Sequence, residues 1–440
     1  MHDEWQVVQF ERLLLEPVRN GIYKPKEFHG RGAKIVNMGE LFANPRLRSV
    51  PMKRVELSTS ETERFNLAVG DLIFARRSLT AEGAGKCSVV LEIEEPTTFE
   101  SSIIRARADR LRAEPLFLYY FFNSPAGFHS LDTIRRQVAV AGITGGDLSR
   151  LEIPVPSLGE QRAIAQILGT LDDKIELNGR MNETLEAIAR ALFKSWFVDF
   201  DPVRAKAEGR DPGLPQPLAD LFPYSFEHSE LGEIPEGWQL VPLPAAIEIN
   251  PTRPLRKGDV APYLDMANMP TRGHSPDNLV DRSFGSGMRF MNGDTLVARI
   301  TPCLENGKTA YVDFLEAQVG WGSTEFIVLR PKPPLPEEFG YCLARSDEFR
   351  DFAIQSMTGS SGRQRVPVES LTHFALATPS EQVAERFGAI VRPLFARARA
   401  TACESRTLAA LRDTLLPKLI SGKLRVKDAE RMIGNEADGS

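Results

Sequence analysis

The chain of 440 residues has few cysteines and no long apolar run. Its four cysteines, Cys87, Cys303, Cys342 and Cys403, are scattered and never form a C-x-x-C pair. This spacing argues against a zinc site or a disulfide framework and suits a reducing cytoplasm. No apolar run reaches the ~18 residues that a membrane span needs, and the six histidines stand alone. We therefore expect a cytoplasmic protein with no membrane segment and no bound metal.

The sequence also lacks the motifs of the enzymes that act on DNA. An amino-methyltransferase needs a glycine-rich cofactor loop and an Asn/Asp-Pro-Pro-Tyr/Phe motif, and neither occurs. No G-x-x-x-x-G-K-[ST] loop for ATP occurs either. Residues 172–174 (DDK) have the D-x-K shape of one class of metal-dependent nucleases. They fall on the polar face of a predicted helix, so we interpret them as solvated. The chain itself is predicted to bind no cofactor and to catalyse nothing.

An excess of positive charge is missing as well. The chain has 54 Lys and Arg against 59 Asp and Glu, a net charge of −5, whereas DNA-binding domains are usually strongly basic. Three explanations stay open at this point. The protein does not bind nucleic acid, or its basic residues gather on one face, or partner subunits supply much of the contact with phosphate.

The chain repeats itself at a period of about half its length, which is informative before any other pattern. Three pairs of segments match in the same order, at offsets of 223, 222 and 221 positions: 70–76 with 293–299, 85–86 with 307–308, and 160–161 with 381–382. Chance explains one such match but not an ordered series. The sequence therefore predicts an internal twofold repeat.

Each repeat has the same predicted order of elements. Apolar runs at 103–104 and 326–329 indicate buried strands. Residues 114–123 and 337–345 indicate short helices that begin near a proline. One long helix then ends each repeat, over about 158–200 and 381–421. The fold class is therefore mixed α/β, with two globular segments and two long helices.

The two long helices carry apolar residues at alternating steps of four and three, which is the pattern of a coiled coil. The pairing residues are predicted to be Leu168, Leu171, Ile175, Leu192 and Trp196 in the first helix, and Phe387, Ile390, Leu394, Leu411 and Leu415 in the second. Both stripes turn polar midway, at Asn178 and Asn182 in one and at Arg397 and Thr401 in the other. The alternative is that each helix lies as an amphipathic helix on its own globular domain.

Basic residues recur at matching places in the two repeats and are the candidate DNA-binding residues. They are Arg76, Arg77, Arg135, Arg136 and Gln137 in the first repeat, and Arg299, Arg363, Gln364 and Arg365 in the second. Arginine reads guanine by a bidentate contact, and glutamine can read adenine in the same way. Glycine-rich stretches at 142–146 and 359–362 flank them, and such loops let backbone amides approach phosphate. A solvated surface charge is the simpler reading of any single arginine here.

Several segments resemble the specificity subunits of type I restriction-modification enzymes. They are 160–165 (EQRAIA), 171–178 (LDDKIELN), 192–203 (LFKSWFVDFDPV), 232–238 (GEIPEGW), 301–308 (TPCLENGK) and 415–422 (LLPKLISG). The resemblance covers both helices and parts of both globular segments. It implies two target-recognition domains separated by a pair of antiparallel coiled-coil helices, each domain reading one half of a split sequence in double-stranded DNA.

The resemblance also implies partners. Two modification subunits, which carry S-adenosylmethionine and methylate adenine, would flank the helices, and nuclease-translocase restriction subunits using ATP and Mg²⁺ would join them. The expected division of the chain is 1–155 for the first target-recognition domain, 156–200 for the central helix, 201–234 for a linker, 235–378 for the second domain, 379–424 for the second helix and 425–440 for a flexible tail. Two other hypotheses stay open: an adaptor that binds only protein, and a fused methyltransferase or nuclease with motifs that are not recognised.

Overall fold

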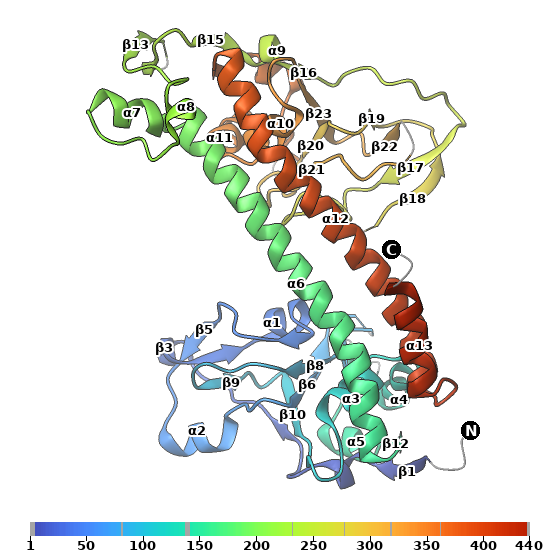
Figure 1. Ribbon diagram of the computed structural model, residues 1–440. Coiled ribbons are helices and arrows are strands. Elements are labelled where there is room, and N and C mark those ends of the chain that lie inside the picture. The colour runs from blue at the N-terminus through green and yellow to red at the C-terminus, as the bar shows by residue number, and fades with distance from the viewer. Residues whose placement is uncertain are drawn as a thin grey trace. The chain divides into compact units, whose positions relative to one another are not determined.

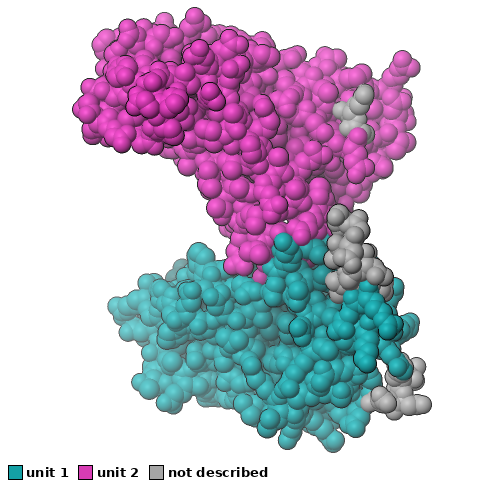
Figure 2. Space-filling model, viewed as in Figure 1, with its two compact units in different colours: residues 1–174, 408–440 teal, residues 175–407 magenta. Residues whose placement is uncertain are grey.

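The computed structural model describes residues 5–80, 82–136, 141–230, 232–276, 278–316, 319–360 and 362–437. The chain divides into two compact units, shown in different colours in Figure 2: unit 1 is formed by residues 1–174 and 408–440, and unit 2 by residues 175–407. Each unit joins a globular region of helices and sheets to parts of two long helices, α6 (Leu158–Phe197) and α12 (Glu381–Ile420). The mixed α/β fold class is therefore confirmed.

Unit 1 is built around a five-stranded sheet. Its strand order is β2 (Arg19–Asn20), β10 (Ile103–Arg107), β6 (Asp71–Ala75), β8 (Cys87–Val90) and β4 (Arg46–Leu47). A second sheet has the order β5 (Lys53–Val55), β3 (His29–Val36) and β9 (Thr97–Phe99). Two-stranded pairs are β1 (Gln6–Gln9) with β12 (Glu152–Val155), and β7 (Arg77–Ser78) with β11 (Ala141–Gly142). Strand β6 is buried along its whole length, as its apolar sequence requires.

The helices of unit 1 are α1 (Met38–Ala43), α2 (Thr59–Phe65), α3 (Pro115–Phe122), α4 (Pro125–Ile134) and α5 (Gly145–Ser149), with 3₁₀ turns at Phe10–Leu13 and Lys26–Phe28. Helices α3 and α4 both begin with proline, which is favourable at the first helical position. The sequence PLFLYYFF makes α3 apolar on all sides. It is almost entirely buried and packs in one core with β6, β10 and the first turns of α6.

Unit 2 contains two four-stranded sheets. One has the order β16 (Ile247–Ile249), β23 (Phe326–Pro331), β20 (Thr295–Ala298) and β21 (Thr309–Tyr311). The other has the order β18 (Val280–Ser283), β17 (Val260–Leu264), β22 (Gly320–Gly322) and β19 (Met288–Phe290). Two-stranded pairs are β15 (Gln239–Pro242) with β24 (Ala375–Thr378), and β13 (Phe226–Ser229) with β14 (Gly232–Pro235).

The helices of unit 2 are α7 (Asp201–Ala207), α8 (Gln216–Ala219), α9 (Leu243–Ala246), α10 (Glu337–Ala344) and α11 (Asp347–Gln355), with a 3₁₀ helix at Val368–His373. Helix α11 is capped by Ser346, as α4 is by Ser124 in unit 1. Aromatic side chains join the long helices to this unit: the ring of Phe197 lies 5.2 Å from that of Phe339 and 4.9 Å from that of Phe387.

The internal repeat is confirmed down to the register of the strands. Ala75 of β6 lies opposite Ile103 of β10, and Ala298 of β20 lies opposite Phe326 of β23, 223 positions later for both partners. In each unit one strand also pairs with a parallel neighbour on one side and an antiparallel one on the other, β3 in unit 1 and β17 in unit 2. Both long helices have 40 residues and begin 223 positions apart. The two units are therefore two copies of one fold (Figure 1).

The long helices run antiparallel, as predicted. In unit 1 the carboxylate of Asp172 accepts a hydrogen bond from Arg412 over 2.7 Å. In unit 2 the amide nitrogen of Asn178 donates to Glu404 over 2.9 Å. As the residue number rises along α6, the partner's number falls along α12. Each unit thus takes the first turns of one long helix and the last turns of the other.

The predicted pairing face of α12 is partly wrong. Ile390 is 39 % exposed and Arg397 is exposed, while Val391, Phe395 and Ala398 are buried. The reason is that α12 packs on the globular region of unit 2 as well as on α6. A helix covered over such a wide face buries a stripe at the natural helical period and not a narrow coiled-coil seam. From the sequence alone, Leu168, Leu171 and Ile175 can be matched with Phe387, Ile390 and Leu394 at an offset of 219. The structure does not support this match, because buried Leu168 corresponds to buried Val391, 223 positions later.

The polar middle of the helix pair is confirmed for three of its four predicted residues. Asn178 and Thr401 are buried, and the Asn178 amide also lies 3.4 Å from Thr401 O. The Thr401 hydroxyl donates to Asn182. Asn178 Oδ1 is buried and has no hydrogen-bond partner among the described residues. Such a polar contact in an apolar interface favours one register of the two helices.

Two segments are more ordered than the sequence suggested. The expected linker, residues 201–234, contains α7, α8, β13 and most of β14, and it adds Val203, Phe222 and Ile234 to the core of unit 2. Helix α12 continues through Pro417 to Ile420, close to its predicted end, and the expected flexible tail forms helix α13 (Val426–Ala437), where Ala429 is buried. Apolar residues between the charged ones allow both segments to pack.

Residues 172–174 also differ from the prediction, because Asp172 is not solvated. Its side chain is buried and accepts hydrogen bonds from Tyr120 and Arg412, both over 2.7 Å. Burial, with the nearby Asp172 carboxylate as a further cause, raises the pKa of the Tyr120 hydroxyl well above its usual range. Asp172 is a structural ion-pair partner that joins α6 to α3 and α12.

Candidate nucleic-acid interface

A short loop follows the central strand of each unit, and most of the predicted DNA-binding residues lie there. In unit 1, β7 pairs with β11 directly after β6. In unit 2, Ile300 forms a bridge with Arg365 directly after β20. We call these regions paired loop 1 (residues 76–78, 136 and 141–143) and paired loop 2 (residues 299–301, 358–360 and 362–366).

The two paired loops share their backbone hydrogen bonds. The amide of Ile143 donates to Arg76 O over 3.0 Å, and the amide of Val366 donates to Arg299 O over 2.9 Å. A hairpin pair closes the far side of each loop, Arg136 with Gly142 in unit 1 and Thr358 with Arg365 in unit 2. The structure therefore brings together, in each unit, basic segments that lie about 60 residues apart in the sequence.

The arginines of paired loop 1 differ in how firmly they are held. Arg77 is exposed, and no described residue forms an ion pair with its guanidinium. Arg136 is also exposed, although it donates to Asp147 over 2.7 Å. Arg76 is half-buried and lies 3.3 Å from Ser101 O. Arg77 is thus an exposed cation of this loop that no ion pair among the described residues holds.

Arg135 is less accessible than the exposed arginines of paired loop 1. Its side chain is largely buried, and its Nε donates to Ala84 O over 2.8 Å. A second nitrogen donates to Asp132 over 3.0 Å. These contacts hold the Arg135 guanidinium against Ala84 and the last turn of α4, and its role in DNA binding stays a prediction. Gln137 lies outside the described residues.

Of the four predicted residues of paired loop 2, two arginines lie around one carboxylate and a third arginine is exposed at the surface. Arg299 and Arg365 both donate to Glu325, over 3.2 and 2.8 Å. Arg363 is exposed at the tip, and no described residue holds it in an ion pair. Gln364 contributes its backbone, because its carbonyl accepts from the amide of Thr301 over 3.0 Å. Glu325 was not predicted from the sequence.

The expected glycine-rich amide loops are only partly present. In paired loop 2, Gly359 and Gly362 have φ of 121° and 79°, a region that favours glycine, and they form the tip of the hairpin. In unit 1, Gly145 and Gly146 instead begin α5, where the Thr144 hydroxyl accepts from the amide of Asp147. A hairpin tip that contains glycines with positive φ is therefore a feature of paired loop 2.

A buried ion pair lies at the beginning of the strand that leads into each paired loop, and sequence reasoning missed both. Asp71 at the start of β6 accepts two hydrogen bonds of 2.7 Å from Arg107. Asp294, directly before β20, accepts one of 2.7 Å from Arg330. Each carboxylate also accepts from a backbone amide three positions earlier, over 2.8 Å. The repeated Gly-Asp of the two matching segments was the available signal.

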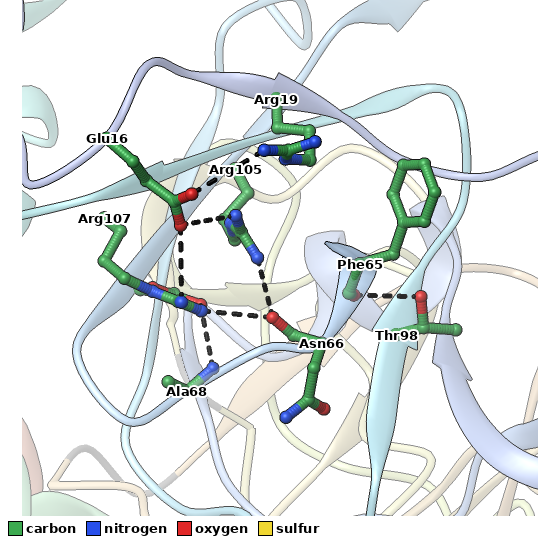
Figure 3. A network of polar contacts seen from close by, with 9 residues as sticks. Glu16, Arg19, Phe65, Asn66, Ala68, Thr98, Arg105 and Arg107 are labelled. Carbon is green, nitrogen blue, oxygen red and sulfur yellow. Dashed lines mark hydrogen bonds and ion pairs between the residues drawn. The ribbon is translucent and has the colours of Figure 1, made fainter. Parts of the chain in front are cut away.

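Figure 3 shows how the unit 1 ion pair extends into a network across strands β2, β10 and the chain before β6. Glu16 accepts from Arg105 over 2.7 Å and lies 3.3 Å from Arg107. Both arginines also donate to Asn66 O, over 2.7 and 3.1 Å. Arg105 is almost fully buried, and burial lowers the pKa of its guanidinium. The network fixes the strand that leads into paired loop 1.

The described residues contain no group of three or more His, Cys, Asp or Glu side chains placed to hold a metal ion. Among the described helices, none combines the length and the apolar character needed to cross a membrane.

Comparisons with known proteins agree with this arrangement. Residues 3–187 match the family described as "Type I restriction modification DNA specificity domain". The chain is 25 % identical over 370 residues to the type I restriction enzyme HindI specificity subunit of Haemophilus influenzae, covering 73 % of this chain and 80 % of that protein. It is 26 % identical over 332 residues to the MjaIX specificity subunit of Methanocaldococcus jannaschii, covering 71 % and 69 %.

A solved structure shares the fold. The crystal structure of a type I restriction-modification S subunit from M. genitalium superposes with a TM-score of 0.54 at 16 % identity, covering 95 % of this chain and 97 % of that one. The structural likeness shows the shared fold. In sequence, the chain is similar to specificity subunits of type I restriction-modification enzymes, and the family match spans residues 3–187.

Proposed function

We propose that the chain reads a split DNA sequence, with paired loop 1 contacting one half and paired loop 2 the other. The observation that carries this proposal is the repetition of the same loop, with exposed arginines, after the same strand in both units. Because the two paired loops share a backbone but differ in side chains, they are suited to recognise two different half-sites. The chain is a DNA specificity subunit and not an enzyme, in agreement with its family.

The net charge of −5 is compatible with this proposal if partner subunits supply much of the phosphate contact. Arg77 and Arg363 are exposed side chains that can reach a base edge, where arginine contacts guanine N7 and O6. Contacts with bases specify a sequence, while contacts with phosphate mainly position the protein. The proposed role of the paired loops is therefore specificity more than affinity.

We further propose that two modification subunits bind the long helices. Each unit combines the first turns of one long helix with the last turns of the other, so one chain offers this type of helical surface twice. In this proposal S-adenosylmethionine belongs to the modification subunits, and ATP with Mg²⁺ to the restriction subunits. All four cysteines are free thiols, which supports a reducing, cytoplasmic location.

Mapping of methylated adenines across the host genome, with and without the gene, tests the function. We expect one split, asymmetric sequence to lose methylation when the gene is deleted and to regain it when the gene is restored. A contiguous motif, or a methylation pattern that does not depend on the gene, would contradict the proposal. If the chain were an adaptor that binds only protein, no particular DNA sequence would lose methylation when the gene is deleted.

Changing Arg363 to alanine should weaken recognition of one half-site only. If this side chain reads a base, the loss should be about 1–3 kcal/mol at one base pair, whereas loss of a phosphate contact weakens all sequences alike. Fluorescence anisotropy of the assembled methyltransferase, with duplexes varied at each position of the mapped sequence, measures the difference. Arg210→Ala is the matched control, because Arg210 is exposed in unit 2 outside the paired loops. If affinity and methylation stay unchanged for Arg363→Ala, paired loop 2 is not the reading surface.

A further inference from the structure

Glu325 holds two arginines of paired loop 2 at once. Its Oε1 accepts from Nε of Arg365 over 2.8 Å and lies 2.8 Å from Nη2 of the same side chain. Its Oε2 accepts from Nε of Arg299 over 3.2 Å. Each carboxylate oxygen therefore serves one guanidinium, and the charge of the group of three stays positive.

The turn that carries Glu325 is itself fixed. The amide of Phe326 donates to Ser323 O over 3.3 Å, and the Glu325 amide donates to the Ser323 hydroxyl over 3.1 Å. The carbonyl of Glu325 also accepts from the amide of Arg299 over 3.0 Å. The carboxylate is thus anchored to the end of β20 through its own backbone.

Unit 1 has the same turn without the carboxylate. The amide of Ile103 donates to Glu100 O over 3.0 Å, and the amide of Arg76 donates to Ser102 O over 2.8 Å. Ser102 stands where unit 2 has Glu325, and Gly142 stands where it has Arg365. The arginine and the carboxylate that holds it are therefore both features of unit 2, although the backbone that would carry them is present in both units.

The contact with Glu325 leaves the far end of Arg365 available. Because Glu325 takes up the Nε side of the guanidinium, each terminal nitrogen keeps an N–H that points away from the carboxylate. The closest other contact is from Nη1 to Arg363 O, at 3.4 Å. The side chain is 43 % exposed. Two parallel N–H groups on the end of an arginine match N7 and O6 of guanine in the major groove.

Stability does not account for this arrangement. The three side chains are 21–43 % exposed, and ion pairs at such partly exposed positions stabilise a fold little. What the carboxylate does supply is a fixed plane and direction for a flexible side chain. A side chain that recognises a base needs this kind of support, since a side chain that moves freely distinguishes poorly between bases.

We propose that Glu325 is a positioning residue that fixes Arg365 to read a guanine in the half-site of unit 2. This inference rests on the proposed function. Arg299, held by the same carboxylate and 28 % exposed, places a second cation beside the reading group. Unit 1, which has serine and glycine at the two positions, reads its half-site by other side chains.

A pool of duplexes with random sequence, methylated by the chain co-expressed with its modification subunit, tests the inference. Sequencing of the methylated fraction should show that the unaltered protein requires guanine at one position of the motif. The Arg365→Ala variant should accept any base at that position. We expect Glu325→Gln to lower the preference for guanine at that same position by about tenfold, within the range of one bidentate contact. Arg365→Lys keeps the positive charge but loses the two parallel N–H donors of the guanidinium, so it should also lose the preference for guanine. The other half-site should not change.

Glu248→Gln is the matched control, because it removes one exposed carboxylate from β16 of the same unit, and it should leave the whole motif unchanged. Thermal unfolding of each variant shows that it is folded. The inference is overturned if Glu325→Gln leaves the guanine preference intact, lowers methylation of all sequences alike, or alters both half-sites. A split motif in which no guanine depends on Arg365 also overturns it, while leaving the proposed function in place. Absence of any split motif for the unaltered protein overturns both.

Discussion

Exchange of residues 201–378 for the corresponding segment of a relative is expected to replace one half of the recognised DNA sequence completely and to leave the other half unchanged. The segment begins after α6 and ends before α12, so it contains paired loop 2 and every sheet of unit 2. The structure requires the exchange to begin at 201. Val203 and Phe222, in the expected linker, belong to the core of unit 2 and must stay with the residues they contact.

Genome-wide mapping of methylated adenine in a strain that carries the hybrid measures the result. A hybrid that begins at 235 is the informative comparison, because it separates Phe222 from its own core and should give less folded protein. The reciprocal exchange of residues 1–157 should change the opposite half of the target. A hybrid that is active but alters both halves would show that the two units do not read DNA independently.

Loss of the buried carboxylate of Asp294 should destabilise unit 2 by about 3–5 kcal/mol, since a buried charge is then left without its partner. Asp294 is 0 % exposed and pairs with Arg253 and Arg330, over 2.6 and 2.7 Å. Asp71→Ala removes the equivalent group from unit 1, where one arginine and not two loses its direct partner. We therefore expect a smaller loss for Asp71→Ala than for Asp294→Ala.

Chemical denaturation gives the free energy of unfolding, and hydrogen exchange locates the loss in one unit. Glu56→Ala is the control, because Glu56 pairs with Arg31 at the surface, and removal of such a pair costs at most about 1 kcal/mol. Equal effects of Asp294→Ala and Glu56→Ala would show that the buried pair contributes no more than a surface pair. Faster exchange in unit 1 after Asp294→Ala would show that the units are not separate in stability.

The repeat was the strongest signal in the sequence. The match of residues 70–76 with 293–299 predicted equivalent strands, and β6 and β20 pair with their neighbours in the same register. Both long helices begin at the predicted residue. These features are encoded locally, by runs of apolar residues and by the residues that end them. The family resemblance added the antiparallel arrangement of the helices, which the ion pair of Asp172 with Arg412 and the hydrogen bond of Asn178 to Glu404 bear out.

The contacts that shape the site could not be predicted in the same way. Glu325 and Arg365 are 40 positions apart, and Asp71 and Arg107 are 36 apart. No spacing rule joins such residues, because their proximity depends on how strands are ordered in a sheet. The burial of Asp172 and the exposure of Ile390 were not predicted either, because they depend on tertiary packing. A helical pattern tells which residues share a face, but the globular region packed against α6 and α12 decides which faces are covered.

The division of both long helices between the units has a consequence for synthesis of the protein. Unit 1 needs Leu415, Leu419 and Ala429 in its core, so the first half of the chain leaves the ribosome before the residues that complete it exist. Unit 2, formed by one continuous stretch, can close earlier. A stop codon after residue 407 therefore removes nothing from unit 2 but opens the core of unit 1, and a late truncation damages the region that was translated first.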